Sequence, residues 1–295
     1  MAKNYTYTDA GVNRKQRVES KKALKNLQET YKHSFFGGIM HLPFGNIFPI
    51  SENLFLDLEI EGVGTKVLLA QLAQKYDTIG IDAIAMVVND VIRSGAKSLA
   101  IADNIHAQES NPRLVKEWLK GIIQGAAESE CPVINGETGD VAEIIKGLTE
   151  NIGFDMVVAA VGQVERKEII TGEGIKPNDP IIGLRSSGLH SNGITMARKI
   201  LFKKWGGKYL PNDKPAGIER EIVLEALEPT RIYVKSLIRL SKKVKIKAAV
   251  HITGDAYMKF NNLTAVSPGI GFEFNNFKPQ PIFDLIQIIF RVGVH

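Results

Sequence analysis

Apolar stretches that end in a polar, glycine-bearing turn recur along this chain of 295 residues and limit what it can fold into. Four such units cover residues 54–66, 133–140, 180–193 and 248–255. A strand that ends at glycines brings backbone N–H groups and short polar side chains to one point, which suits a ligand cleft. Strands and helical segments mix without a strict strand–helix–strand rhythm. The sequence therefore predicts an α+β fold and not a doubly wound parallel sheet.

The other expected elements follow from hydrophobic periodicity. Residues 54–61 alternate apolar and acidic side chains, which predicts a half-buried strand. A helix begins at Asn111-Pro112, because Asn caps a helix and Pro fits its first turn. Gly95 is the expected stop of the preceding helix, predicted at 82–93. The further predicted strands are 99–102, 133–134, 156–161, 180–184 and 248–252, and the further helices are 18–27, 82–93, 194–205, 219–227 and 232–240.

The charged run at residues 165–168 separates two apolar segments and marks a change in composition. A chain of this length has room for two domains of ordinary size. We therefore expect an N-terminal domain of residues 1–167 and a C-terminal domain of residues 168–295.

The charge balance and the cysteine usage exclude several classes of protein. Lys and Arg number 37 and Asp and Glu number 32, so the formal net charge is +5. The basic residues form no dense block, which argues against nucleic-acid binding and fits phosphorylated small molecules. Cys131 is the only cysteine, so we expect no intrachain disulfide and no cysteine-rich metal site. Without a signal peptide or an apolar run of about 18 residues, we expect a soluble, cytoplasmic protein with no membrane partner.

The turn at residues 61–66 carries the first candidate chemistry. Gly62 and Gly64 let backbone N–H groups approach an anion, and Lys66 can balance phosphate charge. The turn is not a Walker A loop, because the upstream glycine spacing is absent. We favour a functional role for this turn over a structural one.

Acidic side chains line one face of the strand before this turn. Asp57, Glu59 and Glu61 follow one another on that face at intervals of about 6.6–7 Å. A hard cation such as Mg²⁺ prefers carboxylate and phosphate oxygens together, so the row is a candidate metal shelf. The alternative is an ordinary solvated strand face, which we favour for Glu59 taken alone.

Two further candidate groups lie in the first half of the chain. One side of the helix predicted at 82–93 carries polar and polarisable residues: Asp82, Met86 and either Asn89 or Asp90. A carboxylate buried there is costly unless it is paired or bound to metal, although a polar helix edge explains the pattern as well. The turn at residues 135–140 places a carboxylate between glycines at a strand end, which suits a ligand and also fits a plain turn.

The run of small polar residues at 186–193 is the sharpest candidate site. Ser191 or Asn192 can cap the helix that follows, and the free N–H groups of its first turn form an anion site. His190 adds a titratable donor at the same end. Capping explains one residue but not the whole run, which favours phosphate or substrate binding. His251, followed by a Thr-Gly-Asp turn, is a second candidate, with a purely structural histidine as the alternative.

Together these pieces resemble the phosphoribosylformylglycinamidine cyclo-ligase family, also called aminoimidazole ribonucleotide synthetases. The resemblance covers nearly the whole chain. Its most specific segments are Asp-Thr-Ile-Gly-Ile-Asp at 77–82 and Thr-Arg-Ile-Tyr-Val-Lys-Ser at 230–236. The matching segments are residues 7–12, 62–66, 77–82, 89–90, 95–96, 103, 136–138, 186–193, 229–236 and 251–254.

The resemblance implies a fold and a reaction. It implies a two-domain protomer, a homodimer in which strands of the N-terminal ATP-binding domains form a barrel, and a long cleft for ATP and substrate. In the implied reaction, part of de novo purine synthesis, ATP phosphorylates the formyl amide oxygen of phosphoribosylformylglycinamidine. The iminophosphate then closes its ring to give aminoimidazole ribonucleotide, ADP and phosphate. ATP and Mg²⁺ are the implied cofactors.

The resemblance also implies roles for residues of this chain. Residues 9–12 would form a mobile flap over the triphosphate, and the 188–193 loop with His251 would bind the ribose phosphate. The implied catalytic residues are Lys66, Asp90, His190 and His251, and the implied metal ligands are Glu61, Asp90 and Glu137. The implied ATP-binding residues are Asp9, Gly11, Val12, Gly62, Gly64, Thr65, Lys66, Asp82, Asn89, Asp103, Gly136 and Thr138. The residues implied for the substrate phosphate are Ser187, Gly188, Ser191, Asn192, Gly193, Thr253 and Gly254.

The chain departs from the family at three places. The family usually has Asp in place of Glu61 and glycine in place of Asp255. Family members usually extend several tens of residues beyond position 295, so we expect a C-terminal domain that is truncated relative to the family. The alternatives are a sister enzyme (selenophosphate synthetase, thiamin-monophosphate kinase or a hydrogenase maturation factor) and a non-catalytic nucleotide-binding subunit. A cysteine near the N-terminus would favour selenophosphate synthetase, and this chain has none there.

Overall fold

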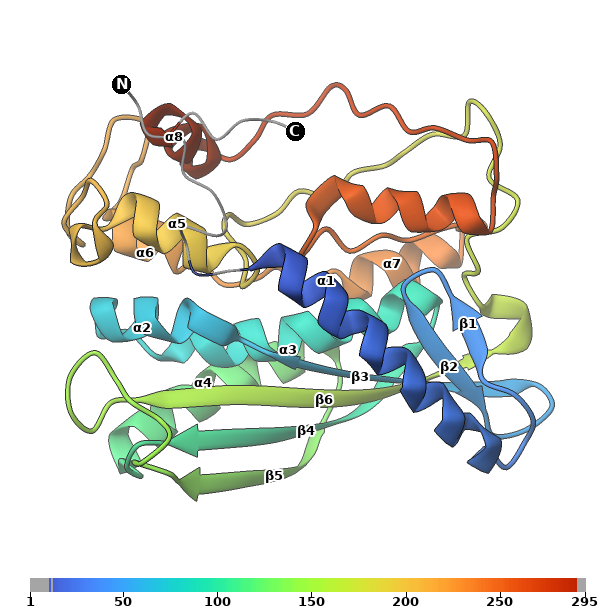
Figure 1. The fold of residues 1–295 in the computed structure, drawn as a ribbon, viewed down its shortest axis with the longest axis horizontal. Helices are drawn as coiled ribbons and strands as arrows, with labels where there is room; N and C mark the ends of the chain where they lie inside the picture. The colour runs from blue at the N-terminus through green and yellow to red at the C-terminus, as the bar shows by residue number, and fades with distance from the viewer. Residues whose placement is uncertain (1–10, 12, 291–295) are drawn as a thin grey trace.

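The computed structural model describes residue 11 and residues 13–290, and a six-stranded mixed sheet forms its centre (Figure 1). The strand order is β1-β2-β3-β6-β4-β5, and neighbours are antiparallel except β4 and β5, which are parallel. The strands are β1 (Met40–Leu42), β2 (Gly45–Pro49), β3 (Leu54–Gly62), β4 (Lys97–Ala107), β5 (Val133–Asp140) and β6 (Phe154–Glu165). The four strands predicted in this part of the chain are confirmed, and each extends further than predicted.

One layer of helices covers a single side of the sheet. Helix α3 (Asp77–Val91) packs on β3 and β6, and α4 (Pro112–Ser129) packs on α3; both lie behind the strands in Figure 1. The predicted cap of α4 is confirmed, because Asn111 Oδ1 accepts a hydrogen bond from Arg113 N at 2.9 Å. The other helical segments of this part are η2 (Gly64–Lys66), α2 (Val67–Ala73), η3 (Ile92–Ser94) and η4 (Arg166–Glu168).

Helices α3 and α4 approach each other so closely that their backbones touch. A Cβ on Gly80 would stand 2.3 Å from Ile122 N, and a Cβ on Gly121 would stand 2.0 Å from Asp77 O. Side chains do not tolerate such distances, so the crossing requires glycine at both positions. The close approach leaves Trp118 of α4 completely buried.

Strand β3 buries the face that carries its carboxylates. The predicted alternation is present, but Asp57 is 3% exposed while Leu58 and Ile60 are 60% and 67% exposed. The acidic face lies against α3 and the apolar face lies on the open side of the sheet. The alternative of a solvated face for Glu59 is therefore wrong. Its partner Arg93, 2.7 Å away at the end of α3, offsets the cost of burying the charge.

Residues 169–290, called the C-terminal region below, contain helices but no paired sheet within the described ranges, in contrast to the sheet region of residues 40–165. The strands predicted at 180–184 and 248–252 are wrong, because these extended segments have no neighbouring strand to pair with. The helices are α5 (Ile194–Leu201), η5 (Lys203–Trp205), α6 (Ile222–Ala226), α7 (Val234–Ser241), η6 (Ala256–Ala265) and α8 (Pro281–Phe290). None of the helices described along the chain has the length and apolar character needed to cross a membrane.

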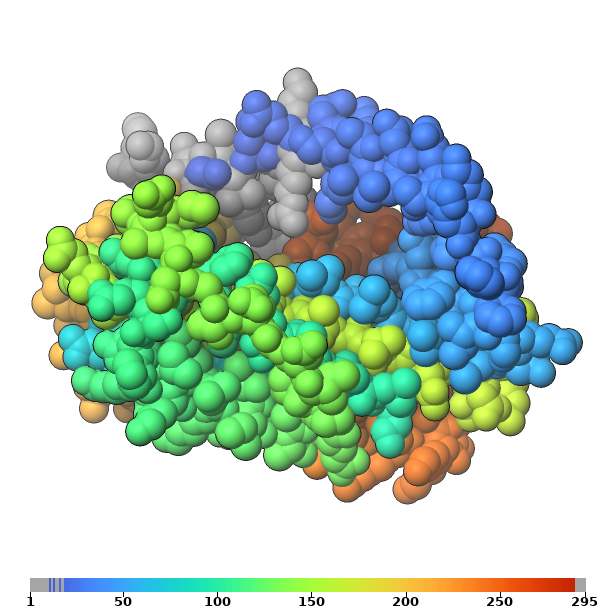
Figure 2. Space-filling model, turned by 90° about the horizontal axis from the view of Figure 1, so that it is seen from below, coloured from blue at the N-terminus to red at the C-terminus, as the bar shows by residue number. Residues whose placement is uncertain are grey.

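The N-terminal helical segment packs only loosely on the rest of the protein. It comprises α1 (Arg14–Ala23) and η1 (Leu24–His33). Figure 2 shows it in dark blue as an arch along one edge of the molecule, with a hollow beneath it. No residue of η1 is buried, and Leu24 and Leu27 are mostly exposed. The segment therefore adds little to the core.

Candidate functional site

One pocket gathers side chains from four separate parts of the chain. Glu61 comes from the end of β3, Asp90 from α3, Asn192 from the loop before α5, and His251 from an extended segment of the C-terminal region. The pocket, with the open space at its mouth, measures about 220 Å³ and is lined by Glu61, Met86, Asp90, Asn192, His251 and Thr253. Residues from four separate sequence motifs thus meet at the seam between the sheet region and the C-terminal region.

Asp90 fixes the orientation of His251. Nδ1 of His251 lies 2.8 Å from Asp90 Oδ1, and Arg93 Nη1 lies 3.4 Å from the same oxygen. Burial acts to raise the pKa of Asp90, but the hydrogen bond from His251 and the charges of Arg93, His251 and Lys259 outweigh it and lower the pKa. An ionised carboxylate only accepts hydrogen bonds, so Nδ1 donates. Nε2 of His251 is buried and has no hydrogen-bond partner among the described residues, which leaves it available to a ligand.

Lys259 is a cation of this site that the sequence analysis missed. It lies in η6, and its Nζ donates to His251 O at 3.1 Å and to Thr253 Oγ1. Burial lowers its pKa, although the carboxylates around it act in the opposite direction. No motif in residues 257–262 indicates such a role, because aromatic and amide residues surround the lysine there.

Lys66 lies inside the protein and not in the pocket. Lys66 and Asp82 are completely buried and form an ion pair of 2.8 Å. The ammonium also donates to Glu228 O at 2.6 Å and to Leu189 O at 3.4 Å. Asp82 Oδ1 accepts from both N and Oγ1 of Thr230, at 2.8 and 2.5 Å. In this structure the polar groups of the two residues join η2 and α3 to the C-terminal region, and their contact with ATP stays a prediction.

Asn89 and Thr65 make connections of the same kind. Asn89 Nδ2 donates to Arg231 O at 2.8 Å, and its Oδ1 accepts from Tyr233 N at 2.9 Å. Thr65 Oγ1 lies 2.8 Å from Thr195 Oγ1 on α5. Side chains implied to bind ATP therefore hold the C-terminal region. We give the name anchor residues to four that bond to the C-terminal region: Lys66 of η2 and, from α3, Asp82, Asn89 and Asp90.

The loop before α5 is bonded to the turn around residue 229. Ser187 Oγ donates to Pro229 O at 2.5 Å and lies 3.1 Å from His190 Nε2. Burial, followed by the charge of Lys66, lowers the pKa of His190 to about 3, so its ring is neutral. Ser191 Oγ is buried without a partner in the described structure. The other residues predicted for the substrate phosphate are Gly188, Asn192, Gly193, Thr253 and Gly254, of which Asn192 and Thr253 line the pocket.

Four of the predicted ligand residues lie on β4 and β5, away from the pocket: Asp103, Gly136, Glu137 and Thr138. The register places Glu137 three strands from the end of β3, about 14 Å away. Glu137 therefore does not line the pocket of Glu61 and Asp90, and the set of three carboxylates stays a prediction. Among the described residues, no group of three or more His, Cys, Asp or Glu could hold a metal.

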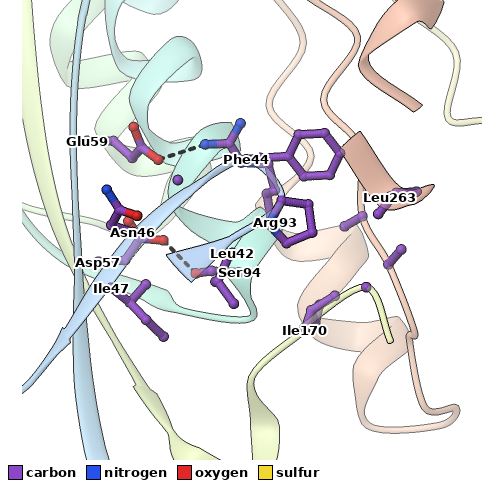
Figure 3. Close-up of a pocket in the computed structure, with 15 residues that line it drawn as sticks. Leu42, Phe44, Asn46, Ile47, Asp57, Glu59, Arg93, Ser94, Ile170 and Leu263 are labelled. Carbon is purple, nitrogen blue, oxygen red and sulfur yellow. Dashed lines mark hydrogen bonds and ion pairs between the residues drawn. The ribbon is translucent and has the colours of Figure 1, made fainter. Parts of the chain in front are cut away.

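A second pocket lies between the β1–β2 hairpin and the C-terminal region (Figure 3). It holds two carboxylates: Arg93 Nη2 lies 2.7 Å from Glu59 Oε1, and Ser94 Oγ donates to Asp57 Oδ2 at 2.5 Å. Burial is the main cause that raises the pKa of Asp57 to about 6 and that of Glu59 to about 7. Arg93, a second residue that the sequence analysis missed, also contacts Asp90 and so links the two pockets.

The N-terminal motif is described only in part. Asp9 and Val12 lie outside the described residues. Gly11 has φ +84° and lies beside α5, where a Cβ on it would stand 3.9 Å from Lys199 Nζ. Gly62 ends β3, and Gly64, with φ +59°, begins the turn that leads to Lys66.

Comparison with known proteins agrees with this order of motifs. The families described as AIR synthase related protein, N-terminal domain and C-terminal domain, match residues 46–164 and 176–284. The phosphoribosylformylglycinamidine cyclo-ligase of Pyrococcus furiosus is 38% identical over 98% of this chain and 82% of its own length. That of Bacillus cereus strain G9842 is 37% identical over 95% of this chain and 81% of its own length. The chain belongs to the phosphoribosylformylglycinamidine cyclo-ligase family.

A solved structure outside the cyclo-ligases shares the fold of this family member. AaThiL complexed with AMPPCP and TMP has a TM-score of 0.50 and 16% identity, and the match covers 83% of this chain and 69% of AaThiL. The likeness concerns the mixed α/β architecture alone. It agrees with the two family domains that match the chain in succession.

This cyclo-ligase family member has, in the pocket and in the turn after His251, the two residues at which the sequence analysis expects departures from the family pattern. Glu61 replaces the usual Asp, and burial together with the charge of Asp90 raises its pKa. Asp255 replaces a usual glycine and has φ +66°, and Ala256 after it has φ +46°. Both backbones lie in the left-handed region that glycine tolerates best.

Proposed function

We propose that this chain is an ATP-dependent cyclo-ligase that converts phosphoribosylformylglycinamidine to aminoimidazole ribonucleotide in de novo purine synthesis. The observation that carries this proposal is its 37–39% identity to curated cyclo-ligases through both parts of the chain. The same identity favours this function over a sister ATP-dependent enzyme and over a nucleotide-binding subunit without turnover. The pocket at the seam between the two regions is the place for the chemistry.

The reaction has two steps. First, the formyl amide oxygen of the substrate attacks the γ-phosphorus of ATP, so that an O–P bond forms and ADP leaves. Second, the nitrogen that closes the ring attacks the formyl carbon, which carries the phosphorylated oxygen. A C–N bond forms, and the C–O bond breaks to release phosphate. That nitrogen gives up a proton during the second step. The site therefore has to bind phosphate charge and accept one proton.

His251 is the residue that accepts this proton. Its Nδ1 donates to the ionised Asp90, which fixes the ring and leaves Nε2 as the atom that can accept. Nε2 is buried, lacks a partner in the described structure, and belongs to a residue that lines the pocket. Arg93 contacts the same oxygen of Asp90 as His251 does. We expect His251→Gln to lower kcat about 100-fold or more, the usual contribution of a general base.

The pocket fits Mg²⁺ that arrives with ATP better than a resident metal. Glu61 and Asp90 offer two carboxylates, and Asn192 lines the same pocket with an amide oxygen. Magnesium commonly takes one or two carboxylates and completes its shell with phosphate oxygens and water. When bound, Mg²⁺ supplies positive charge that stabilises the transferring phosphoryl group. Because Asp90 also binds His251, Glu61 is the carboxylate left for the ion.

The substrate phosphate binds at the loop before α5. No side chain caps the start of this helix in the described structure, which leaves its first turn open to an anion, and the buried hydroxyl of Ser191, three residues earlier, lacks a partner among the described residues. The resemblance also assigns residues 9–12, of which Gly11 alone is described, to the triphosphate of ATP. We also propose the domain boundary at residues 167 and 168, in the interval between the two matched family domains. The location that suits a buried free cysteine is the cytoplasm.

The open face of the sheet is the dimer interface. Leu58 and Ile60 on β3 and Ile134 on β5 are 60%, 67% and 69% exposed on the side opposite α3. An apolar face this broad on a sheet usually marks an interface. Two copies joined there would complete the barrel that the resemblance implies. We expect Leu58→Lys to shift the protein from dimer to monomer in light scattering, and Leu119→Lys on the outside of α4 to leave the mass unchanged.

The first experiment incubates the full chain with ATP, Mg²⁺ and phosphoribosylformylglycinamidine and measures ADP and the diazotisable aminoimidazole product together. Equal amounts of both, formed only with substrate present, are the expected result. ADP without aminoimidazole would replace the proposal with a kinase-like sister activity. Binding of ATP with neither product would indicate a nucleotide-binding subunit.

A further inference from the structure

The turn after His251 holds two residues in a conformation that non-glycine residues rarely adopt. Asp255 has φ +66° and Ala256 has φ +46°. In this left-handed region the Cβ crowds the following carbonyl oxygen, and a glycine is the residue that avoids the strain. A strained turn persists only where its surroundings hold it. Something near residues 253–256 must therefore fix this segment.

Lys259 contacts this segment at His251 and at Thr253. Its Nζ donates to the carbonyl oxygen of His251 at 3.1 Å and to the hydroxyl of Thr253. The ammonium group thus bridges the residues before the turn from the helix η6 that follows it. The charges of Glu61 and Asp90 lie close enough to favour an ammonium group at this position.

These contacts fix His251 from three sides. Its Nδ1 is bonded to Asp90 at 2.8 Å, and its ring meets that of Tyr233 edge to face at 6.4 Å. Its carbonyl oxygen is held by Lys259. A shift of this segment would move the open Nε2 away from the pocket, and a displacement of about 1 Å in a catalytic group can lower the rate roughly 100-fold.

We propose that Lys259 is a positioning residue that ties the strained turn to the pocket wall and so keeps His251 in place against Asp90. The proposal rests on the cyclo-ligase function, because that is the reaction for which His251 is held. A lysine that only stabilised the surface would affect folding without changing the state of the His251 ring or depending on the strain at Ala256.

The kinetic test compares Lys259→Met with Lys242→Met, a matched removal of an exposed lysine at the end of α7. We expect Lys259→Met to lower kcat about 10- to 100-fold with less than about a threefold change in the KM of ATP. Lys259→Arg keeps the charge and the donors and should lose less than Lys259→Met. It also serves if the methionine variant fails to fold. A Lys259→Met variant as active as Lys242→Met would overturn the proposal.

A second readout does not depend on turnover. Long-range ¹H–¹⁵N spectra of the histidine rings report the tautomer, and the His251 signal is assigned by its loss in His251→Gln. The wild type should show a single Nδ1–H tautomer, and Lys259→Met should show a mixture, while Lys242→Met keeps the wild-type pattern. An unchanged His251 signal in Lys259→Met would refute the positioning role. If the wild type has no cyclo-ligase activity, the proposed function fails and this comparison still decides the role of Lys259.

The third test removes the strain. Ala256→Gly should restore part of the kcat and the single tautomer in a Lys259→Met background, since a relaxed turn needs no tether. The two substitutions would then be strongly non-additive, as expected for residues that act on one segment. Simple addition of their separate effects would contradict the link between Lys259 and the turn.

Discussion

The sheet region and the C-terminal region are held together in different ways. In the sheet region, β4 and β6 are 11 and 12 residues long and pair along their length, and α3 and α4 pack so closely that glycines form the contact. In the C-terminal region, extended segments such as 180–184 have no partner strand, and Ile182 is 69% exposed. The first region is stabilised by its own ladder and core. The second lacks such a ladder and packs its buried apolar residues into a core that it shares with the first.

A few buried polar side chains reinforce a hydrophobic core that the two regions share. The anchor residues Lys66, Asp82, Asn89 and Asp90 bond to backbone and side-chain groups between residues 189 and 251. The pocket lies along the same seam, so the contacts that attach the C-terminal region also assemble the site. Stability and site geometry are therefore coupled in this protein through α3, and the following predictions test that coupling.

The largest effect is expected from Lys66→Met. The substitution leaves Asp82 as an unpaired charge with no exposure, and breaking a buried pair from one side typically costs about 3 to 5 kcal/mol. Urea unfolding followed by Trp fluorescence and by circular dichroism should show this loss. The two probes should also separate, because the C-terminal region would come away before the sheet region unfolds.

Two variants check this interpretation. Lys66→Met combined with Asp82→Asn removes the unpaired charge and should recover part of the lost free energy of unfolding. Lys22→Met breaks a surface pair whose side chains are 66% and 60% exposed, and it should change the free energy of unfolding by less than about 0.5 kcal/mol. Equal effects of Lys66→Met and Lys22→Met would mean that the anchor residues do not hold the C-terminal region.

The next largest effect is expected within the sheet region, from Gly121→Ala. Its Cβ would stand 2.0 Å from Asp77 O, so the helices must separate, which costs about 2 to 3 kcal/mol despite the better helix propensity of alanine. Gly183→Ala in the C-terminal region meets no atom within 4 Å and should change stability by less than about 0.5 kcal/mol. Thermal unfolding of both variants measures the difference, and a neutral Gly121→Ala would show that the crossing is not tight.

Asp57→Asn tests the acidic pair between the regions. Burial raises the pKa of Asp57 to about 6, above its ordinary value of 3.8. Between these two pH values the unfolded chain has already lost the proton that the folded chain keeps, so stability falls as pH rises from about 4 to 6. Above pH 6 the free energy of unfolding stays lower by this amount.

The asparagine variant has no proton to lose at this position. It should be more stable than the wild type by about 1 to 2 kcal/mol at pH 8, with little difference at pH 4. Denaturant unfolding at pH 4, 6 and 8 measures the change, and Asp284→Asn on the exposed part of α8 is the control. A gain at pH 4 that equals the gain at pH 8 would exclude titration of Asp57 as its cause.

Much of the sheet region could be predicted from the sequence because its signals are local. The alternation in residues 54–61 predicted a strand, and the Asn-Pro pair predicted the start of α4. The same alternation does not tell which face is buried, and here Asp57 faces the protein while Leu58 and Ile60 face outward. The reason lies in partners far along the chain, Arg93 and Ser94, which satisfy the acids.

The candidate site was predicted in part. Glu61, Asp90, Asn192 and His251 do meet in one pocket, although the strands expected at 180–184 and 248–252 are not formed. Lys66 was placed among the ligand contacts because a lysine after glycines usually meets phosphate. Its burial depends on three acceptors, two of them more than 120 residues away in sequence. The strands at 180–184 and 248–252 failed because strand propensity acts only where a neighbour exists.

The smallest expected effect, from Ala256→Gly, tests whether the C-terminal region carries local strain that the sheet region avoids. Ala256 has φ +46°, so removing its Cβ should raise the free energy of unfolding by about 0.5 to 1 kcal/mol, measured by urea unfolding. Ala265→Gly makes the same substitution at the exposed end of η6, where the left-handed conformation is absent, and should lower stability by about 0.5 kcal/mol. If the two Ala→Gly substitutions change the free energy of unfolding in opposite directions, backbone strain at Ala256 is separated from the general flexibility that glycine adds. Equal losses would mean that the turn beside His251 is not strained, and the need for a lysine tether would fall with it.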